Sequence, residues 1–156
     1  MNIALINLSG NVGKSTLAVH LFAAMRPGAK IISVESVNSS DADTIQGIEV
    51  EEIEASSFRE IFRELMMAEG DVILDVGASN VEDFVKLMQQ YRGSHEEFDL
   101  FVVPTVKDSK QIKDTIATVQ ALKAMGVPAK KITVVFNKLQ SSETVEEEFY
   151  PLIQYH

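Results

Sequence analysis

Apolar residues gather along the chain in five short blocks that show no regular alternation with polar residues. The blocks are rich in Val and Ile and lie at residues 3–8, 30–34, 71–76, 100–103 and 132–136. Blocks of this kind are typical of strands that are buried on both faces of a parallel sheet. The pattern therefore predicts five strands that neighbouring layers shield from water on both sides.

Between these blocks, apolar residues recur every three or four positions, as on one face of an amphipathic helix. The helical segments cover residues 17–25, 58–65, 84–91 and 112–122. Because strands and helices alternate, we predict an α/β fold of three layers, with a mostly parallel central sheet of at least five strands flanked by helices. Right-handed crossovers are expected to alternate the helices between the two faces of the sheet. Ligands bind such sheets at the carboxyl ends of the strands.

The chain is expected to form a single domain over residues 1–156. Folding hides about 70% of the surface of a chain of this length, which is enough for one core. Hydrophobic residues make up 46% and charged residues 24% of the chain, as in ordinary globular domains. Residues 140–156 look like the start of another helix with little after it, which leaves open that the chain is a truncated form.

Composition and charge exclude several classes of function. The chain has no cysteine, so disulfides, zinc–thiolate sites and iron–sulfur clusters are excluded, and its 3 histidines are too scattered in sequence to suggest a metal cluster. A net charge of −9 repels polyanions, so any contact with nucleic acid would need a local patch. The first residues show neither a signal peptide nor a membrane span, so we expect a cytoplasmic protein without membrane insertion.

The strongest chemical signal is the segment SGNVGKST at residues 9–16, between the first strand and the first helix. It is typical of the phosphate-binding loop of P-loop NTPases, although Leu8 stands where the usual pattern has its first glycine. Glycines let backbone N–H groups approach a phosphate closely, and a helix N-terminus favours anions. A glycine turn that merely joins strand to helix is the alternative, but it gives no reason for a Lys-Ser pair there. The candidate nucleotide-binding residues are Gly10, Asn11, Val12, Gly13, Lys14, Ser15 and Thr16.

The polar residues around this loop have predicted roles. Lys14 is expected to reach the β- and γ-phosphates, and the Ser15 hydroxyl to coordinate a Mg²⁺ ion that bridges them. Asp75 closes the apolar run of the third predicted strand and is expected to hold the same ion with Ser15, while Gly77 offers its N–H to the γ-phosphate. The alternative for Asp75 is a carboxylate bonded to a neighbouring turn, which would leave the loop without a metal partner.

Two residues at the end of the fifth predicted strand suggest a base-binding role. The Asn137 amide offers a donor and an acceptor to a purine edge, and the stem of Lys138 can lie along the ring. GTPases carry an aspartate two residues after the lysine, where this chain has Gln140, so adenine is favoured. A strand followed by a turn that begins at the asparagine is the alternative reading.

These segments together resemble the ParA/MinD superfamily of nucleotide-binding proteins, and within it the StbB family of plasmid stability proteins. The resemblance rests on residues 10–16, 35–38, 75–80, 103–105 and 136–138, and it extends to 91–96. It implies ATP or ADP bound with Mg²⁺ and a P-loop NTPase fold. It also implies a nucleotide-dependent homodimer and a small DNA-binding partner in plasmid stability or partition, with conjugation as an open extension.

The resemblance also implies which residues act in hydrolysis. The signature lysine of the superfamily falls on Ser9, and the second of its two acidic residues after the second strand falls on Val37. Glu35 matches the first acidic position and is expected to assist the attacking water, with acidic residues further along (Asp41 and Asp43) as alternatives. The predicted catalytic residues are Lys14, Glu35 and Asp75, and hydrolysis is expected to be slow. Residues 36–47 and the loop after Gly77 are candidate switches.

Two other functions stay open. A P-loop kinase of a small metabolite would use the same Lys14 and Ser15, but it should carry a lid rich in arginine, and the sequence shows no arginine cluster. A nucleotide-binding switch or scaffold would hold ATP or ADP and scarcely hydrolyse it. Direct contact with DNA also stays open. Three lysines recur every three residues and could line one side of a helix, but acidic residues lie among them, as on a solvated helix face. The lysines are Lys107, Lys110 and Lys113.

Overall fold

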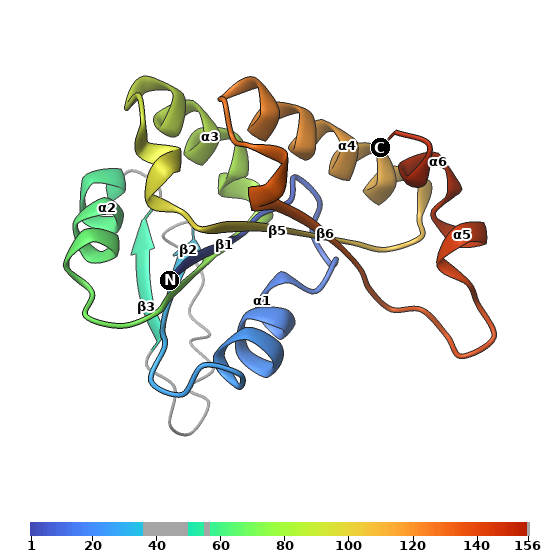
Figure 1. The fold of residues 1–156 in the computed structure, drawn as a ribbon, viewed down its shortest axis with the longest axis horizontal. Coiled ribbons are helices and arrows are strands. Elements are labelled where there is room, and N and C mark those ends of the chain that lie inside the picture. Colours follow the sequence, from blue (N-terminus) through green and yellow to red (C-terminus); the bar gives the residue numbers. More distant parts are fainter. Residues whose placement is uncertain (36–49, 55–56, 156) are drawn as a thin grey trace.

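A six-stranded, all-parallel sheet forms the centre of the computed structural model, which describes residues 1–35, 50–54 and 57–155. The strands follow the order β3-β2-β4-β1-β5-β6 across the sheet (Figure 1). Their bounds are β1 Asn2–Leu5, β2 Lys30–Glu35, β3 Val50–Glu54, β4 Val72–Val76, β5 Leu100–Thr105 and β6 Ile132–Phe136. The predicted α/β fold with at least five parallel strands is confirmed.

Strand β3 is the one strand of the described sheet that the apolar pattern missed. Its sequence, VEEIE, carries three glutamates, which lower strand propensity and resemble the acidic segments around it. An edge strand tolerates such residues because it pairs on one side only, and charges on an edge discourage pairing with other chains. β3 pairs in parallel with β2 alone, from Ile31 opposite Val50 to Glu35 opposite Glu54.

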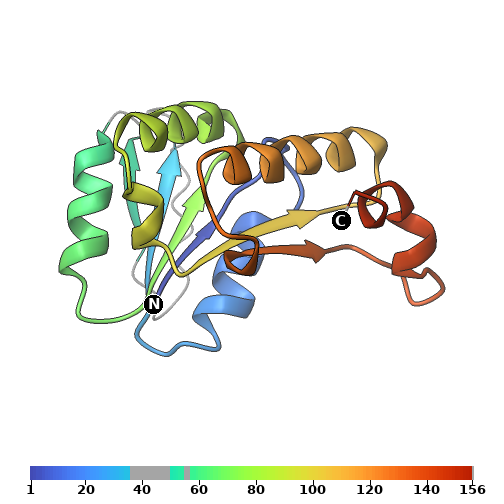
Figure 2. The same cartoon turned by 45° about the horizontal axis from the view of Figure 1, so that its top comes forward.

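The helices cover the two faces of the sheet unequally. Figure 2 shows α1 on one face and α3 and α4 on the other. The expected alternation was wrong because the connections from β3 to β4, β4 to β5 and β5 to β6 all step in one direction across the sheet, which puts right-handed crossovers on one face. The bounds are α1 Lys14–Leu17, continued by the π-helical η1 Ala18–Ala23, then α2 Phe58–Met67, α3 Val81–Gln90 and α4 Ser109–Ala124.

Successive residues of the central strands serve two separate cores. In β1 and just beyond it, Ile3 and Leu5 pack with residues of α1 and η1, whereas Ala4 and Ile6 pack with residues of α2, α3 and α4. All four side chains are fully buried. The prediction of strands buried on both faces is therefore confirmed for β1, the strand that leads into the phosphate loop.

Short helices complete the structure at the end of the described chain and between the longer elements. Phe149 lies between α5 Val145–Glu148 and α6 Tyr150–Ile153, and it packs on Phe136 with ring centroids 4.7 Å apart. Three 3₁₀ turns, η3 Ala78–Asn80, η4 Ser94–Glu97 and η5 Ala129–Lys131, follow or precede strands. Within the described residues, no helix is both long and apolar enough to cross a membrane.

Candidate functional site

A polar cavity lies where β1 and β4 end, at the carboxyl edge of the sheet. Its volume is about 350 Å³. Leu5 of β1 is in register with Asp75 of β4, so the loop that follows β1 passes directly beside that carboxylate. The cavity is lined by Gly10, Asn11, Gly13, Lys14, Ser15, Thr16, Asp75, Gly77, Ala78 and Lys138. The structure thus brings together nine of the twelve residues that the sequence predicted for a nucleotide site; Val12 and Asn137 are not among those that line the cavity, and the side chain of Glu35 lies outside what the structure describes.

The loop between β1 and α1 has the backbone conformation of an anion-binding turn. Asn11 has a φ of 58° and Gly13 a φ of 93°, both in the left-handed region. Gly13 is the residue before the first turn of α1, and its carbonyl accepts the Leu17 N–H at 2.9 Å. Left-handed residues beside a helix start turn successive N–H groups toward one point, which suits a phosphate. Val12, another predicted loop residue, is fully buried and does not line the cavity.

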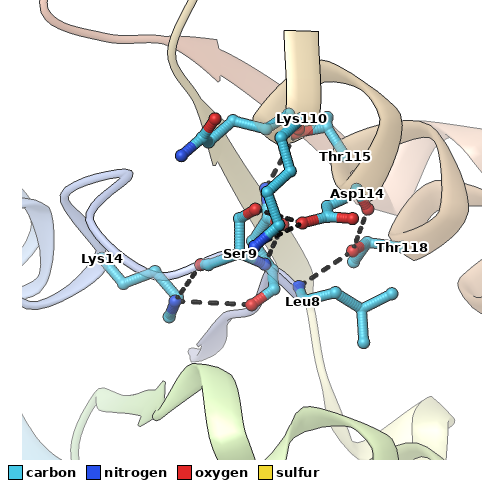
Figure 3. A network of polar contacts seen from close by, with 9 residues as sticks. Leu8, Ser9, Lys14, Lys110, Asp114, Thr115 and Thr118 are labelled. Carbon is cyan, nitrogen blue, oxygen red and sulfur yellow. Dashed lines mark hydrogen bonds and ion pairs between the residues drawn. The ribbon is translucent and has the colours of Figure 1, made fainter. Parts of the chain in front are cut away.

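The Lys14 side chain lies along the loop rather than in solvent. The residue is only 8% exposed. Its Nζ donates to the Ser9 carbonyl at 2.9 Å and to the Asn7 carbonyl at 3.4 Å (Figure 3). An ammonium group held by carbonyls at the edge of a polar cavity keeps its charge available to an anion there.

Asp75 has the features expected of a metal ligand. It is 5% exposed, and its Oδ1 is buried without a hydrogen-bond partner among the described residues. Burial raises the pKa of the Asp75 carboxyl above its usual value, while a hydrogen bond with the Ser15 side chain and the charge of Lys14 oppose that rise. A buried oxygen without a donor is costly unless a cation meets it.

The donor set around Asp75 fits Mg²⁺ better than a transition metal. Mg²⁺ is a hard cation that takes oxygen ligands, and proteins commonly supply one or two of them while water and phosphate supply the others. Asp75 and the adjacent Ser15 hydroxyl meet that requirement. The described part of the chain holds no group of three or more His, Cys, Asp and Glu side chains that could hold a metal by itself.

Asn137 and Lys138, which follow β6, hydrogen-bond to the backbone of the phosphate loop. The Asn137 Nδ2 donates to the Val12 carbonyl at 3.0 Å, and the Lys138 Nζ donates to the Asn11 carbonyl at 2.7 Å. The Asn137 Oδ1 accepts the N–H of Lys138, which has a φ of 58°. An amide nitrogen has two hydrogens, so one remains for a base. Contact with a purine stays a prediction, whereas contact with the loop is what the structure shows.

Gly77 lines the cavity, but its N–H is engaged within the sheet. It donates to the Val34 carbonyl of β2 at 3.0 Å. The turn η3 after Gly77 is tied to the same carbonyl, because the Asn80 Nδ2 donates to it at 3.2 Å. In this conformation the neighbouring strand already satisfies the Gly77 donor, and a bond from it to a γ-phosphate stays a prediction.

Glu35, the predicted helper of the attacking water, ends β2. Its backbone is paired with β3, but the position of its side chain lies outside what the structure describes. The candidate switch at residues 36–47, with Val37, Asp41 and Asp43, also lies outside the described residues. The other candidate switch, the loop after Gly77, is the η3 turn.

A polar network that the sequence patterns did not indicate joins the start of the loop to α4 (Figure 3). Asn7 is fully buried, and its Nδ2 donates to the Pro104 carbonyl at 2.8 Å and to the Thr115 Oγ1 at 2.9 Å. The Leu8 N–H donates to the Thr118 Oγ1 at 3.1 Å. Ser9, only 1% exposed, donates its hydroxyl to Asp114. The spacing of these α4 residues, on the helix face that also carries buried Val119, could have revealed the network.

Comparisons with known proteins place the chain in a family. Residues 3–154 match the model of the CobQ/CobB/MinD/ParA nucleotide binding domain. A comparison with curated protein sequences gives no match.

Three solved structures illustrate the likeness of fold. The MinD cell division protein of Aquifex aeolicus has a TM-score of 0.63 at 12% identity, over 97% of this chain and 78% of that one. A protein described as a plasmid partition protein of Borrelia burgdorferi, bound to AMPPNP, has a TM-score of 0.59 at 12% identity, over 98% of this chain and 78% of that one. An ATP complex of a McdA variant from Cyanothece has a TM-score of 0.55 at 15% identity, over 99% of this chain and 78% of that one.

Proposed function

The chain belongs to the CobQ/CobB/MinD/ParA nucleotide-binding family, and on that premise we propose that it binds ATP or ADP with Mg²⁺ around Lys14 and hydrolyses ATP slowly. The finer proposal is a cytoplasmic plasmid stability protein of the StbB type. Its activity would serve plasmid partition or maintenance, together with a small DNA-binding partner.

The observation that carries the proposal is the Asp75 Oδ1, which lies beside Lys14 and Ser15 and is buried with no hydrogen-bond partner in the described part of the chain. A domain that only needed to fold would gain stability by giving this oxygen a donor or by replacing the carboxylate. Keeping a buried carboxylate whose pKa is raised is typical of a functional site. A cation held by Asp75 would satisfy the orphaned oxygen and supply positive charge for a bound phosphate.

The positions of Lys14, Ser15 and Asp75 around the cavity support the proposed roles of the residues. The backbone N–H groups of residues 10–16 and the Lys14 ammonium bind the phosphates, and Asn137 and Lys138 hold the loop in shape for them. Ser15 and Asp75 would hold Mg²⁺, which neutralises charge on the phosphate oxygens when bound. Glu35, at the end of β2, is proposed to assist the attacking water.

Slow hydrolysis is proposed because the loop offers no second cation at residue 9. Ser9 is buried against α4, so the residue at this position cannot extend from the loop toward a second nucleotide site. Cations that stabilise the charge of the transition state contribute large factors in phosphoryl transfer. The same observation favours a second candidate function, a nucleotide-dependent switch or scaffold whose output is the binding of a partner or a homodimer.

Titration calorimetry with Mg-ATP, Mg-ADP and Mg-GTP tests the proposal. We expect binding of the adenine nucleotides that disappears in Lys14→Ala and persists in the matched control Lys113→Ala, which removes an exposed lysine of α4. Equal affinity of wild type and Lys14→Ala for Mg-ATP would reject the site. Turnover without a phosphoryl acceptor separates the ATPase from a kinase, and nucleotide-dependent dimerisation without turnover would favour the switch.

A further inference from the structure

Asp114 contacts the phosphate loop although it lies 105 residues away from Ser9 in the sequence. The carboxylate projects from α4, and its Oδ2 accepts the Ser9 hydroxyl hydrogen (Figure 3). The Asp114 side chain is 29% exposed, whereas Ser9 is 1% exposed. A hydroxyl that donates to a carboxylate forms a stronger hydrogen bond than one between neutral groups.

Ser9 in turn fixes the ammonium group of Lys14. The Ser9 carbonyl accepts from the Lys14 Nζ at 2.9 Å, and the Ser9 N–H donates to the Asn7 Oδ1 at 2.8 Å. All the polar groups of Ser9 are therefore engaged, and its carbonyl is the nearer of the two carbonyls, those of Ser9 and Asn7, to which the ammonium donates. A rotation of this residue would move the charge of Lys14 relative to the cavity.

We infer that Asp114 is a positioning residue of the nucleotide site, which acts through Ser9 to hold Lys14 where the phosphates bind. The inference rests on the proposed function. Small misplacements of a group that orients a ligand cost large factors in binding or rate. Asp114 is thus assigned to the site without lining the cavity.

The contacts of Asp114 with Lys110 and Thr118 give no reason for a carboxylate at this position. The Lys110 Nζ is 3.9 Å from the Asp114 Oδ2, and its side chain is 81% exposed. Such an exposed pair contributes little. Thr118 donates to the backbone carbonyl of Asp114, at 2.7 Å, and so needs no carboxylate. The buried group that hydrogen-bonds to the Asp114 carboxylate is therefore the Ser9 hydroxyl.

Affinity for Mg-ATP in a set of variants tests the inference. Asp114→Ala should weaken binding about 10-fold, as expected for losing a hydrogen bond to a charged group. Asp114→Asn keeps an acceptor oxygen and should recover most of that loss, which a merely structural requirement for a small side chain would not predict. Ser9→Ala should weaken binding similarly. A variant that carries both Ser9→Ala and Asp114→Ala should show no further loss, because each change removes the same hydrogen bond between Ser9 and Asp114.

Two controls separate this link from general effects of charge and helix stability. Lys110→Ala removes the exposed partner of Asp114, and Asp83→Ala removes an exposed carboxylate from α3. Both should bind Mg-ATP as the wild type does. Unchanged affinity in Asp114→Ala, or losses that add in the double variant, would overturn the inference.

Amide hydrogen exchange in the nucleotide-free protein keeps the inference distinct from the proposed function. Asp114→Ala should speed exchange at Ser9 several-fold, whereas Asp83→Ala should leave it unchanged. If the wild type bound no nucleotide but this exchange still rose, the proposed function would fail and the positioning of the loop would stand. Exchange at the wild-type rate in Asp114→Ala would overturn the positioning whether or not nucleotide binds.

Discussion

The Asn137 side chain occupies the space where a side chain on Gly13 would lie. A Cβ added to Gly13 would come within 2.3 Å of the Asn137 Nδ2, and the φ of 93° at Gly13 is itself unfavourable for other residues. Two features therefore favour a glycine before α1: its backbone conformation, and the Asn137 side chain, which would have to move to admit a Cβ. This contact closes the phosphate loop against the end of β6.

Gly13→Ala is expected to disrupt both the fold and the site. Gly93 has a similar φ of 85° with no atom within 4 Å of an added Cβ, so Gly93→Ala reports the cost of the conformation alone. That cost is about 1 kcal/mol. Urea unfolding should show a larger loss of stability for Gly13→Ala, and calorimetry at least a roughly 10-fold loss of Mg-ATP affinity. Equal stability of the two variants would contradict the contact with Asn137.

Asp75 makes the stability of the nucleotide-free protein depend on pH. Burial raises the pKa of its carboxyl in the folded state, so the folded protein binds the proton more tightly than the unfolded chain does. Stability from this group is fully present below the unfolded pKa, near 3.8, and is lost as the pH rises through the folded pKa. Asp75→Asn should remove this pH-dependent loss of stability. The urea concentration at the unfolding midpoint should therefore be higher for the variant than for the wild type at neutral pH.

The same substitution should cost the protein its metal-dependent binding. Asp75→Asn is expected to weaken Mg-ATP at least about 10-fold, because an amide oxygen lacks the charge of a carboxylate. Binding by the wild type should weaken as the pH falls through the raised pKa of Asp75, since protons then compete with Mg²⁺. A variant that binds Mg-ATP as tightly as the wild type would remove Asp75 from the metal site.

Inorganic tripolyphosphate can separate the two roles considered for Asn137. Through its bond to the Val12 carbonyl, Asn137 shapes the phosphate loop for any polyphosphate. Asn137→Ala should then weaken Mg-tripolyphosphate and Mg-ATP by similar factors, of about 10-fold. A loss confined to Mg-ATP would instead assign Asn137 to the base. Thr133→Ala, on the exposed side of β6, is the matched control and should change neither affinity.

ATP turnover by the purified protein is expected to be slow. With Ser9 held against Asp114, no cation extends from residue 9 of the loop, and intrinsic rates of P-loop NTPases without such help are on the order of 10⁻³ s⁻¹. Phosphate release should occur at about this rate or below it and should need Mg²⁺. Turnover of about 1 s⁻¹ without a partner would show that another group supplies the missing charge.

The buried network under the loop is expected to stabilise the fold. Thr115 is fully buried, and its Oγ1 accepts from the Asn7 Nδ2. Its single hydroxyl hydrogen has two acceptors within reach, the Gln111 carbonyl at 2.7 Å and the Thr105 Oγ1 at 2.9 Å. Thr115→Val keeps the shape but removes the hydroxyl, which should cost about 1–3 kcal/mol in urea unfolding. Thr133→Val, at an exposed strand position, should be close to neutral. Equal effects of the two substitutions would mean that the Thr115 hydroxyl contributes nothing to stability.

The sequence alone predicted the layers and most of the candidate site, because both depend on local patterns. Blocks of Val and Ile specify strands buried on both faces, and a Gly-Lys-Ser turn after such a strand specifies a phosphate loop. Lys14, Ser15 and Asp75 meet in one cavity because the carboxyl ends of parallel strands share an edge. These predictions needed no knowledge of distant contacts.

Tertiary structure alone decided what surrounds the loop. Three hydrogen bonds around the loop join residues far apart in the chain. The Gly77 N–H donates to β2, Asn137 donates to the loop, and Ser9 donates to Asp114. Polar side chains can satisfy their hydrogen bonds in water or with many partners, so sequence patterns do not fix which partner they meet. The packing of α4 against the sheet and the place of β6, on the far side of β5 from β1, make that choice, and with it the shape of the phosphate site.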